Sequence, residues 1–184
     1  MRAPAPPYRG EGPHRLWHVS EDPAIGRFVP HRAATAQTDD ALVWAVDTRH
    51  LPLYWFPRDC PRCTFWAGPQ STAADVARLL GGDRSARIHV IEDRWRERVA
   101  TTELQLYRLP SATFTETPES AGFWVSRQPV EALARITIGD LVARHAAAGI
   151  ALRTTDDLWP LWDEVVGSTL EFSGMRLRNA VPRP

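Results

Sequence analysis

Short apolar runs, each bounded by polar or turn residues, recur along the chain and predict β-strands. The clearest run covers residues 41–47 (ALVWAVD) and is typical of a buried strand. Closer to the N-terminus, Trp17 and Val19 alternate with His18 and Ser20, so we expect the two polar side chains to share the opposite strand face. The same signals predict strands over residues 63–67, 87–91, 104–109 and 122–126, and an extended segment over 130–138.

Helices are predicted where apolar residues recur every three or four positions after a capping residue. Ser71 or Thr72 is the expected N-cap of one such helix, and Gly81 is expected to end it. A second helix is predicted over residues 140–148, and a charged helix is expected around Trp95.

Two further helices contain proline. The segment 158–166 has helical spacing and is expected to be broken at Pro160. Thr48 is the expected cap of a short helix that reaches Tyr54 or Trp55.

The order of these elements favours the α+β class. Strands come in clusters rather than in strict alternation with helices, so we predict one domain with a mixed or split antiparallel β core and a few peripheral helices. We expect this domain to cover residues 15–180, after a disordered proline-rich leader over 1–14 and before a frayed tail over 181–184.

Composition and charge narrow the range of functions. Basic and acidic residues number 22 each, a balance that argues against a nucleic-acid or membrane-surface partner. All basic residues are arginine, which excludes a P-loop lysine and Schiff-base chemistry. No apolar run approaches the roughly 18 residues of a membrane span, and no targeting signal is visible, so we expect a cytoplasmic protein.

Several common chemical motifs are missing from the sequence. No glycine-rich dinucleotide fingerprint, nucleophile elbow or metalloprotease motif occurs. Cys60 and Cys63 form a C-x-x-C pair, which we interpret as two small half-buried residues; a redox dithiol and half of a zinc site are the alternatives. We therefore predict no metal site.

Four polar clusters embedded in tryptophan-rich sequence are the candidate site. The first contains His18 and Ser20, and a histidine there can hydrogen-bond a ligand or act as a base near neutral pH. The alternative is a histidine with a purely structural role, which only stabilises the turn that follows it. The second cluster runs from Asp47 into residues 54–63 (YWFPRDCPRC).

The second cluster offers both an aromatic face and cationic donors. Tyr54 supplies the ring, and Arg58 and Arg62 supply forked donors suited to phosphate or carboxylate. Asp59 can simply pair with either arginine.

The third and fourth clusters lie in the C-terminal half. The third contains Trp124 and Ser126, and the fourth contains Arg176 and Arg178, which would face one way on an extended segment. The alternative for both is a solvated strand face.

The chain as a whole resembles an uncharacterised bacterial family of unknown function. The matching segments are HVSEDPAI, LVWAVD, FPRDCPR, GFWVSRQPV and SGMRLRNA, which together span most of the chain. This resemblance implies no particular chemistry.

The order of elements also resembles the ADP-ribosyltransferase-like fold. Members place a histidine on the first strand, as in LWHVS, and an aromatic residue after the second strand, where Tyr54 stands in VWAVDTRHLPLYWF. The resemblance implies that His18 holds the ribose of NAD and Tyr54 stacks on its nicotinamide. The acid of a later strand is missing from GFWVSRQPV, and Glu119 is the nearest upstream carboxylate.

From these observations we predict a protein that binds NAD as co-substrate, or a related nucleotide, and that can cleave the nicotinamide–ribose bond by ADP-ribosyl transfer or hydrolysis. Glu119, Asp47 or Asp59 would supply the negative charge that the ribose needs. The alternatives are a non-catalytic binding module and a biosynthetic or hydrolytic enzyme with an anionic substrate. The predicted catalytic residues are His18, Tyr54 and Glu119, and the predicted binding residues are Ser20, Asp47, Arg58, Arg62, Trp124, Ser126 and Arg176.

Overall fold

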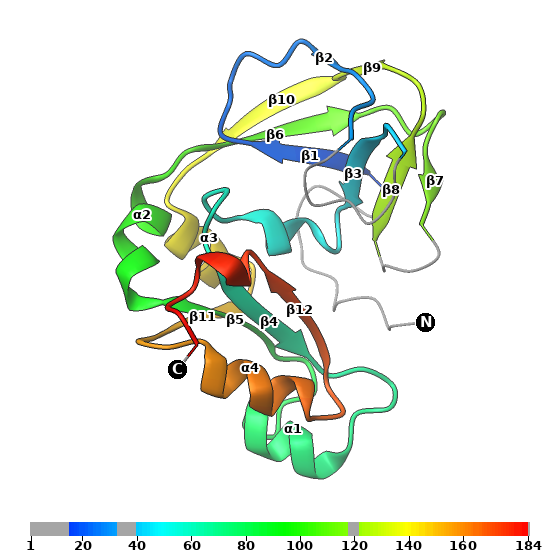
Figure 1. Ribbon diagram of the computed structural model, residues 1–184. Helices are drawn as coiled ribbons and strands as arrows, with labels where there is room; N and C mark the ends of the chain where they lie inside the picture. The colour runs from blue at the N-terminus through cyan, green and yellow to red at the C-terminus, as the bar shows by residue number, and fades with distance from the viewer. Residues whose placement is uncertain (1–14, 33–39, 118–121, 184) are drawn as a thin grey trace.

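Two β-sheets stacked on one another form the framework of the computed structural model (Figure 1). The structure describes residues 15–32, 40–117 and 122–183, so the expected leader over 1–14 and Glu119 lie outside the described residues. The first sheet is antiparallel, with strand order β10-β6-β1-β3-β8-β7. Its strands are β1 (Leu16–Ser20), β3 (Val43–Asp47), β6 (Leu104–Leu109), β7 (Thr115–Glu116), β8 (Phe123–Ser126) and β10 (Ala134–Ile138).

The second sheet is mixed, with strand order β11-β5-β4-β12. Only the β11–β5 pair is parallel, and the other two pairs are antiparallel. Its strands are β4 (Arg62–Trp66), β5 (Arg87–Glu92), β11 (Ile150–Thr155) and β12 (Glu171–Met175). A separate two-stranded ladder joins β2 (Arg27–Phe28) to β9 (Val130–Glu131).

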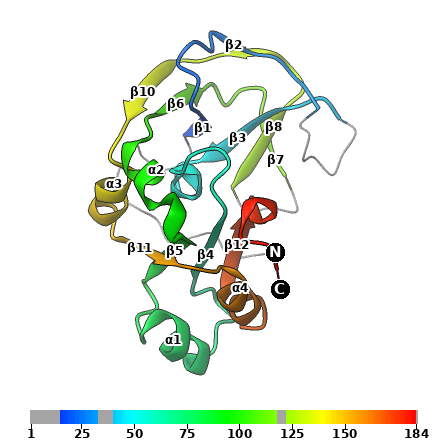
Figure 2. The same cartoon turned by 60° about the vertical axis from the view of Figure 1, so that its left-hand side comes forward.

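The described residues form four α-helices around this framework: α1 (Ala73–Leu80), α2 (Arg96–Thr101), α3 (Leu141–Ala147) and α4 (Trp159–Val166). Figures 1 and 2 show α1 and α4 below the second sheet, and α3 contacts α2 and β11. The described ranges also contain three short 3-10 helices: η1 (Leu51–Tyr54), η2 (Asp93–Trp95) and η3 (Leu177–Asn179).

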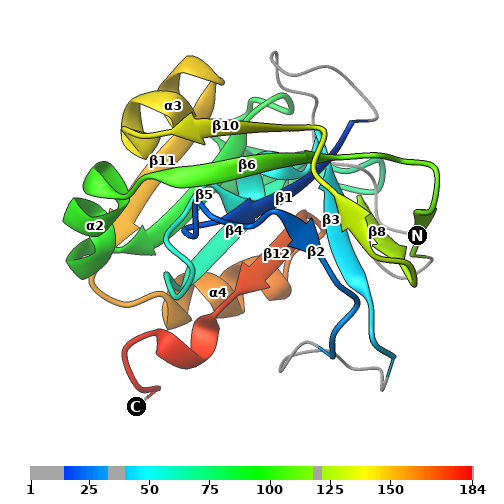
Figure 3. The same cartoon turned by 90° about the horizontal axis from the view of Figure 1, so that it is seen from above.

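The main core fills the space between the two sheets. Trp17 and Val46 enter it from the first sheet, Ile91 and Ile150 from the second, and η1 lies between them (Figure 1). Viewed from above, β1 and β6 cross over β4 and β5 (Figure 3). A second core lies between the outer face of the second sheet and helices α1 and α4.

The local signals explain where most elements begin and end. Thr72 caps α1, because its Oγ1 accepts the backbone N–H of Asp75 at 3.2 Å, and Gly81 ends the helix with φ of 66°. Asp140 caps α3 in the same way, through the N–H of Ala143. Together with the sheets, these helices confirm the predicted α+β class.

Two expectations about helix starts are wrong. Pro160 does not break α4 but occupies its first turn, where a missing N–H costs no hydrogen bond. Thr48 does not cap η1: His50 occupies the N-cap position, without a capping side-chain hydrogen bond. The Thr48 hydroxyl instead accepts the indole N–H of Trp17 at 2.9 Å.

The segment around the fourth polar cluster also differs from expectation. The chain is extended only as far as Met175, and η3 follows, so Arg176 and Arg178 do not alternate along a strand. Arg176 has φ of 57°, a left-handed conformation that is unusual for a residue other than glycine. Val181, the first residue of the expected frayed tail, accepts the indole N–H of Trp159 at 2.7 Å.

Candidate functional site

The first sheet splits between β1 and β3. Strand β1 pairs with β6 along all five of its residues, but with β3 only through Leu16 and Trp17. Beyond this point the carbonyl oxygen of Trp44 lies 3.0 Å from Nδ1 of His18, so a side chain takes the place of a ladder hydrogen bond. The strands therefore diverge at the position of His18.

A cleft of about 1210 Å³ opens at this split. It is lined by both sheets, by the turn that follows β1, by η1 and by the start of η3. Its lining residues include His18, Ser20, Glu21, Asp22, Arg27, Phe28, His31, Trp44, Tyr54, Phe56, Arg58, Arg62, Phe123, Met175, Arg176 and Arg178. A mixed aromatic and polar lining of this size is typical of a ligand site.

His18 is held as a neutral acceptor. Because the Trp44 carbonyl can only accept, Nδ1 of His18 carries the proton and Nε2 keeps its lone pair. Burial lowers the pKa of His18, and the hydrogen bond to Trp44 opposes this in part. Its ring also packs against Phe28, with a centroid distance of 4.8 Å. This tautomer suits a ligand hydroxyl that donates to Nε2.

Aromatic rings form one wall of the cleft. Tyr54 and Trp44 each make edge-to-face contacts with Phe123, at centroid distances of 6.0 Å and 6.2 Å. Burial raises the pKa of Tyr54, while the nearby Arg62 and Arg176 oppose that shift. The phenol is therefore neutral at physiological pH and presents an uncharged aromatic surface.

Positive charge dominates the cleft. Among the described residues, its lining contains five arginines and two carboxylates, Glu21 and Asp22. Glu21 accepts the backbone N–H of Arg58 at 2.7 Å, and Arg176 donates Nε–H to the Arg58 carbonyl at 3.0 Å. These bonds join the turn after β1, the loop before β4 and the start of η3 around the opening.

Arg62 lies deepest among these arginines, with an exposed fraction of 4%. It donates to the carbonyl oxygens of Leu53 at 2.8 Å and Cys60 at 2.9 Å, and its Nη2 lies 2.9 Å from Sδ of Met175. Burial lowers its pKa to about 10, so it stays charged at neutral pH. The Phe56 ring, 5.0 Å from its Cζ, adds a cation–π contact.

The comparisons with known proteins find one match. A family of unknown function (DUF6886) matches residues 17–180. The chain belongs to this family. The predicted membership of an uncharacterised family is thus confirmed, while no curated protein and no solved structure matches the chain.

Six of the residues predicted from the sequence meet in the cleft of this DUF6886 protein. They are His18, Ser20, Tyr54, Arg58, Arg62 and Arg176. Their segments lie far apart in the sequence, and the split sheet and η1 bring them together. Glu119 falls outside the described residues.

Three predicted residues lie away from the cleft of the DUF6886 chain. Asp47 accepts the backbone N–H and Nδ1 of His50, both at 2.8 Å. Ser126 is buried and donates to Thr113 at 2.9 Å, and Trp124 packs against the apolar cluster on the other face of the first sheet. The structure gives each of them a packing or local hydrogen-bonding partner instead of a place in the cleft.

Sequence reasoning missed several wall residues of the DUF6886 cleft. Phe28, Phe123 and Met175 were not candidates, because nothing in their sequence context separates them from core residues. Glu21 directly follows Ser20 of the first polar cluster, but the surrounding sequence also fits an ordinary turn. The bond from Glu21 to the Arg58 amide was not foreseeable from sequence spacing.

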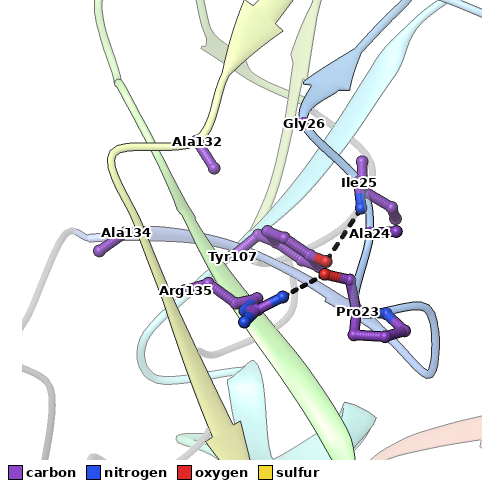
Figure 4. Close-up of a pocket in the computed structure, with 8 residues that line it drawn as sticks. All are labelled: Pro23, Ala24, Ile25, Gly26, Tyr107, Ala132, Ala134 and Arg135. Carbon is purple, nitrogen blue, oxygen red and sulfur yellow. Dashed lines mark hydrogen bonds between the residues drawn. The ribbon is translucent and has the colours of Figure 1, made fainter.

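A second, smaller pocket of about 360 Å³ lies behind the turn that follows β1 (Figure 4). The Tyr107 hydroxyl donates to the carbonyl of Asp22 at 2.7 Å and accepts the N–H of Ile25 at 3.2 Å, and Arg135 donates to the carbonyl of Pro23. Ile25 lines both cavities. The turn therefore separates the two cavities, and Tyr107 and Arg135 hold its backbone by hydrogen bonds from the side of the smaller pocket.

Among the residues that the structure describes, no group of three or more His, Cys, Asp or Glu side chains is placed to hold a metal ion. Cys60 and Cys63 are free and buried, and burial raises the pKa of both thiols to about 12.

No helix in the described ranges is long and apolar enough to cross a membrane.

Proposed function

We propose that this chain binds NAD in the cleft at the split of the first sheet, within an ADP-ribosyltransferase-like fold, and cleaves the bond between nicotinamide and ribose. The observation that carries the proposal is that His18 and Tyr54, which the resemblance names for ribose and nicotinamide, line one cleft together with a buried arginine. The neutral tautomer of His18 leaves Nε2 to accept a ribose hydroxyl.

The cleft offers a partner for each part of such a ligand. The rings of Tyr54, Trp44 and Phe123 suit a flat aromatic base or nicotinamide. The arginine-rich side suits a diphosphate, since guanidinium groups bind phosphate in a forked geometry.

The cleavage would break the bond between the ribose carbon and the nicotinamide nitrogen. The electron pair of that bond passes to the ring nitrogen, nicotinamide leaves neutral, and a water or acceptor hydroxyl adds to the ribose carbon and gives up its proton. The developing positive charge on the ribose needs a nearby negative group. Of the described carboxylates, Glu21 and Asp22 line the cleft, and we propose Glu21 for this task because its position is fixed by Arg58.

A non-catalytic binding module is the second candidate. Glu21 and Asp22 are both exposed, and the other charged side chains among the described lining residues are arginines. Such a cleft can hold an anionic ligand tightly without the buried carboxylate that glycosidic cleavage benefits from.

The deciding experiment uses the purified full chain with NAD. Nicotinamide release is followed by chromatography, and thermal unfolding is measured with and without NAD. We expect a higher melting temperature with NAD, release of nicotinamide, and loss of both effects in His18→Ala. The exposed Arg127, which pairs with Asp40 and does not line the cleft, provides the control variant Arg127→Gln.

The outcomes separate the candidates. A shift in melting temperature without nicotinamide release would favour the binding module over catalysis. If NAD neither stabilises the chain nor is cleaved, the proposal is wrong.

A further inference from the structure

Arg62 is a buried cation whose hydrogen bonds leave its charge without a negative partner. Its described acceptors are two backbone carbonyls and one thioether, and no carboxylate of the described residues forms an ion pair with it. Burying a charged group without a counter-charge is unfavourable, and cation–π contacts with Phe56 and Tyr54 offset this cost only in part. An anion beside Arg62 would remove that imbalance.

Met175 occupies the side of Arg62 from which an anion could approach. The two residues are direct partners on neighbouring strands β12 and β4, and Met175 itself lines the cleft and is partly exposed. A thioether sulfur is only a weak acceptor, and the methionine side chain is flexible. Rotation of this one side chain would expose Nη2 of Arg62 to the cleft.

Arg176 brings a second guanidinium to the same wall. It directly follows Met175, its left-handed backbone turns the chain from β12 into η3, and its Nε is tied to the carbonyl of Arg58. Arg176 is close enough to Arg62 to lower the pKa of that residue. Two cations that repel each other on one cleft wall favour a ligand with more than one negative charge.

We infer that Arg62 and Arg176 form a binding subsite for a phosphoryl or diphosphate group, and that Met175 Sδ stands where a phosphoryl oxygen binds. The inference rests on the proposed function for the identity of the whole ligand, but the subsite recognises the phosphoryl group itself. Inorganic pyrophosphate is therefore a sufficient probe.

The test compares pyrophosphate binding by the full chain and by variants at the subsite, using calorimetric titration and thermal unfolding at constant ionic strength. We expect pyrophosphate to stabilise the wild-type chain, and Arg62→Lys to weaken binding by about tenfold or more, because lysine lacks the planar fork. Arg127→Gln removes an exposed arginine outside the cleft and should leave binding unchanged.

Met175 provides a variant that does not depend on losing the buried arginine. Met175→Glu places a carboxylate beside Arg62, so we expect a higher melting temperature without ligand and little further effect of pyrophosphate. Met175→Leu replaces the thioether by an apolar side chain of similar size and should still bind. If wild-type and Met175→Glu chains respond equally to pyrophosphate, or if neither responds, the inference is wrong.

The two proposals fail in different ways. Pyrophosphate binding that depends on Arg62, without any effect of NAD, would support the subsite and overturn NAD as the ligand. NAD binding that is unchanged in Arg62→Lys would support the proposed function and overturn the subsite.

Discussion

His89 and His145 form a hydrogen-bonded pair that solvent does not reach, and both have an exposed fraction of 0%. Nδ1 of His145 lies 2.6 Å from the carbonyl oxygen of Leu141, so it carries the proton and Nε2 accepts from Nδ1 of His89 at 3.1 Å. These hydrogen bonds thus require a neutral His145, because its Nε2 must keep a lone pair to accept from His89.

Burial lowers the pKa of both histidines, with that of His145 at about 4 and that of His89 well below its usual value. The positive charges of Arg87 and Arg62 act on both rings in the same direction. The unfolded chain therefore binds more protons than the folded chain below pH 6.5, and stability falls as the pH is lowered.

The size of this loss follows from the unfolded state. At pH 5 the folded His145, with a pKa of about 4, is largely unprotonated, whereas an unfolded histidine with a pKa near 6.5 is protonated, which costs about 2 kcal/mol. The lowered pKa of His89 adds to this loss in the same direction. We expect the pair to lower the free energy of unfolding by at least about 2 kcal/mol between pH 7 and pH 5, a substantial share of the roughly 5–15 kcal/mol of a typical domain.

The assay is urea unfolding at pH 7, 6 and 5, with linear extrapolation to water. The double variant His89→Gln with His145→Gln lacks both titrating rings, so it should lose at least about 2 kcal/mol less than the wild-type chain over this range. His18, whose pKa is also lowered, contributes to both proteins and cancels in the comparison. His31→Gln changes an exposed histidine and is the control. Equal losses in the wild-type chain and the double variant would refute the reasoning.

Two further predictions concern packing and thiol reactivity. A Cβ at Gly174 would lie 2.4 Å from the ring of Trp162, so we expect Gly174→Ala to lower the free energy of unfolding, measured in urea, by about 1–3 kcal/mol. At Gly139 the nearest atom would be 3.8 Å away, so Gly139→Ala should cost less. Equal costs for the two variants would contradict this reasoning. Cys60 and Cys63 are buried thiols with raised pKa values, so a thiol reagent should react with them only after denaturation, and rapid reaction of the native chain would instead favour the redox alternative.

Most of the fold could be predicted because the apolar pattern within most strands is enough to identify them. The apolar run of β3 and the alternation in β1 are visible in the sequence, and Trp17, Val43 and Val46 are buried as these patterns predict. Strand β12 (EFSGM) has no such signal, because its extended conformation depends on pairing with β4. The parallel strand β11 likewise depends on β5, to which it pairs along its whole length.

The types of residue at the candidate site could be predicted from the sequence, but the burial of their side chains could not. The cluster of Tyr54, Arg58 and Arg62 was apparent from the sequence, yet nothing there shows that all of β4 is buried and Arg62 with it. Asp47 was an equally reasonable candidate, but its carboxylate is taken by His50 three residues later. Whether a polar side chain bonds a sequence neighbour or lines a cleft depends on the tertiary structure, and the spacing of residues in the sequence does not show it.

The divergence of β1 from β3 makes His18 part of the sheet as well as part of the cleft. Because its ring satisfies the Trp44 carbonyl, a substitution that removes the imidazole would both abolish an acceptor for the ligand and loosen the seam between the two halves of the sheet. A bound ligand would tighten that same seam, so hydrogen exchange at the amides of β1 and β3 should slow on binding. In the proposed function, ligand affinity and the pairing of β1 with β3 therefore depend on the same imidazole, so a substitution at position 18 should change both at once.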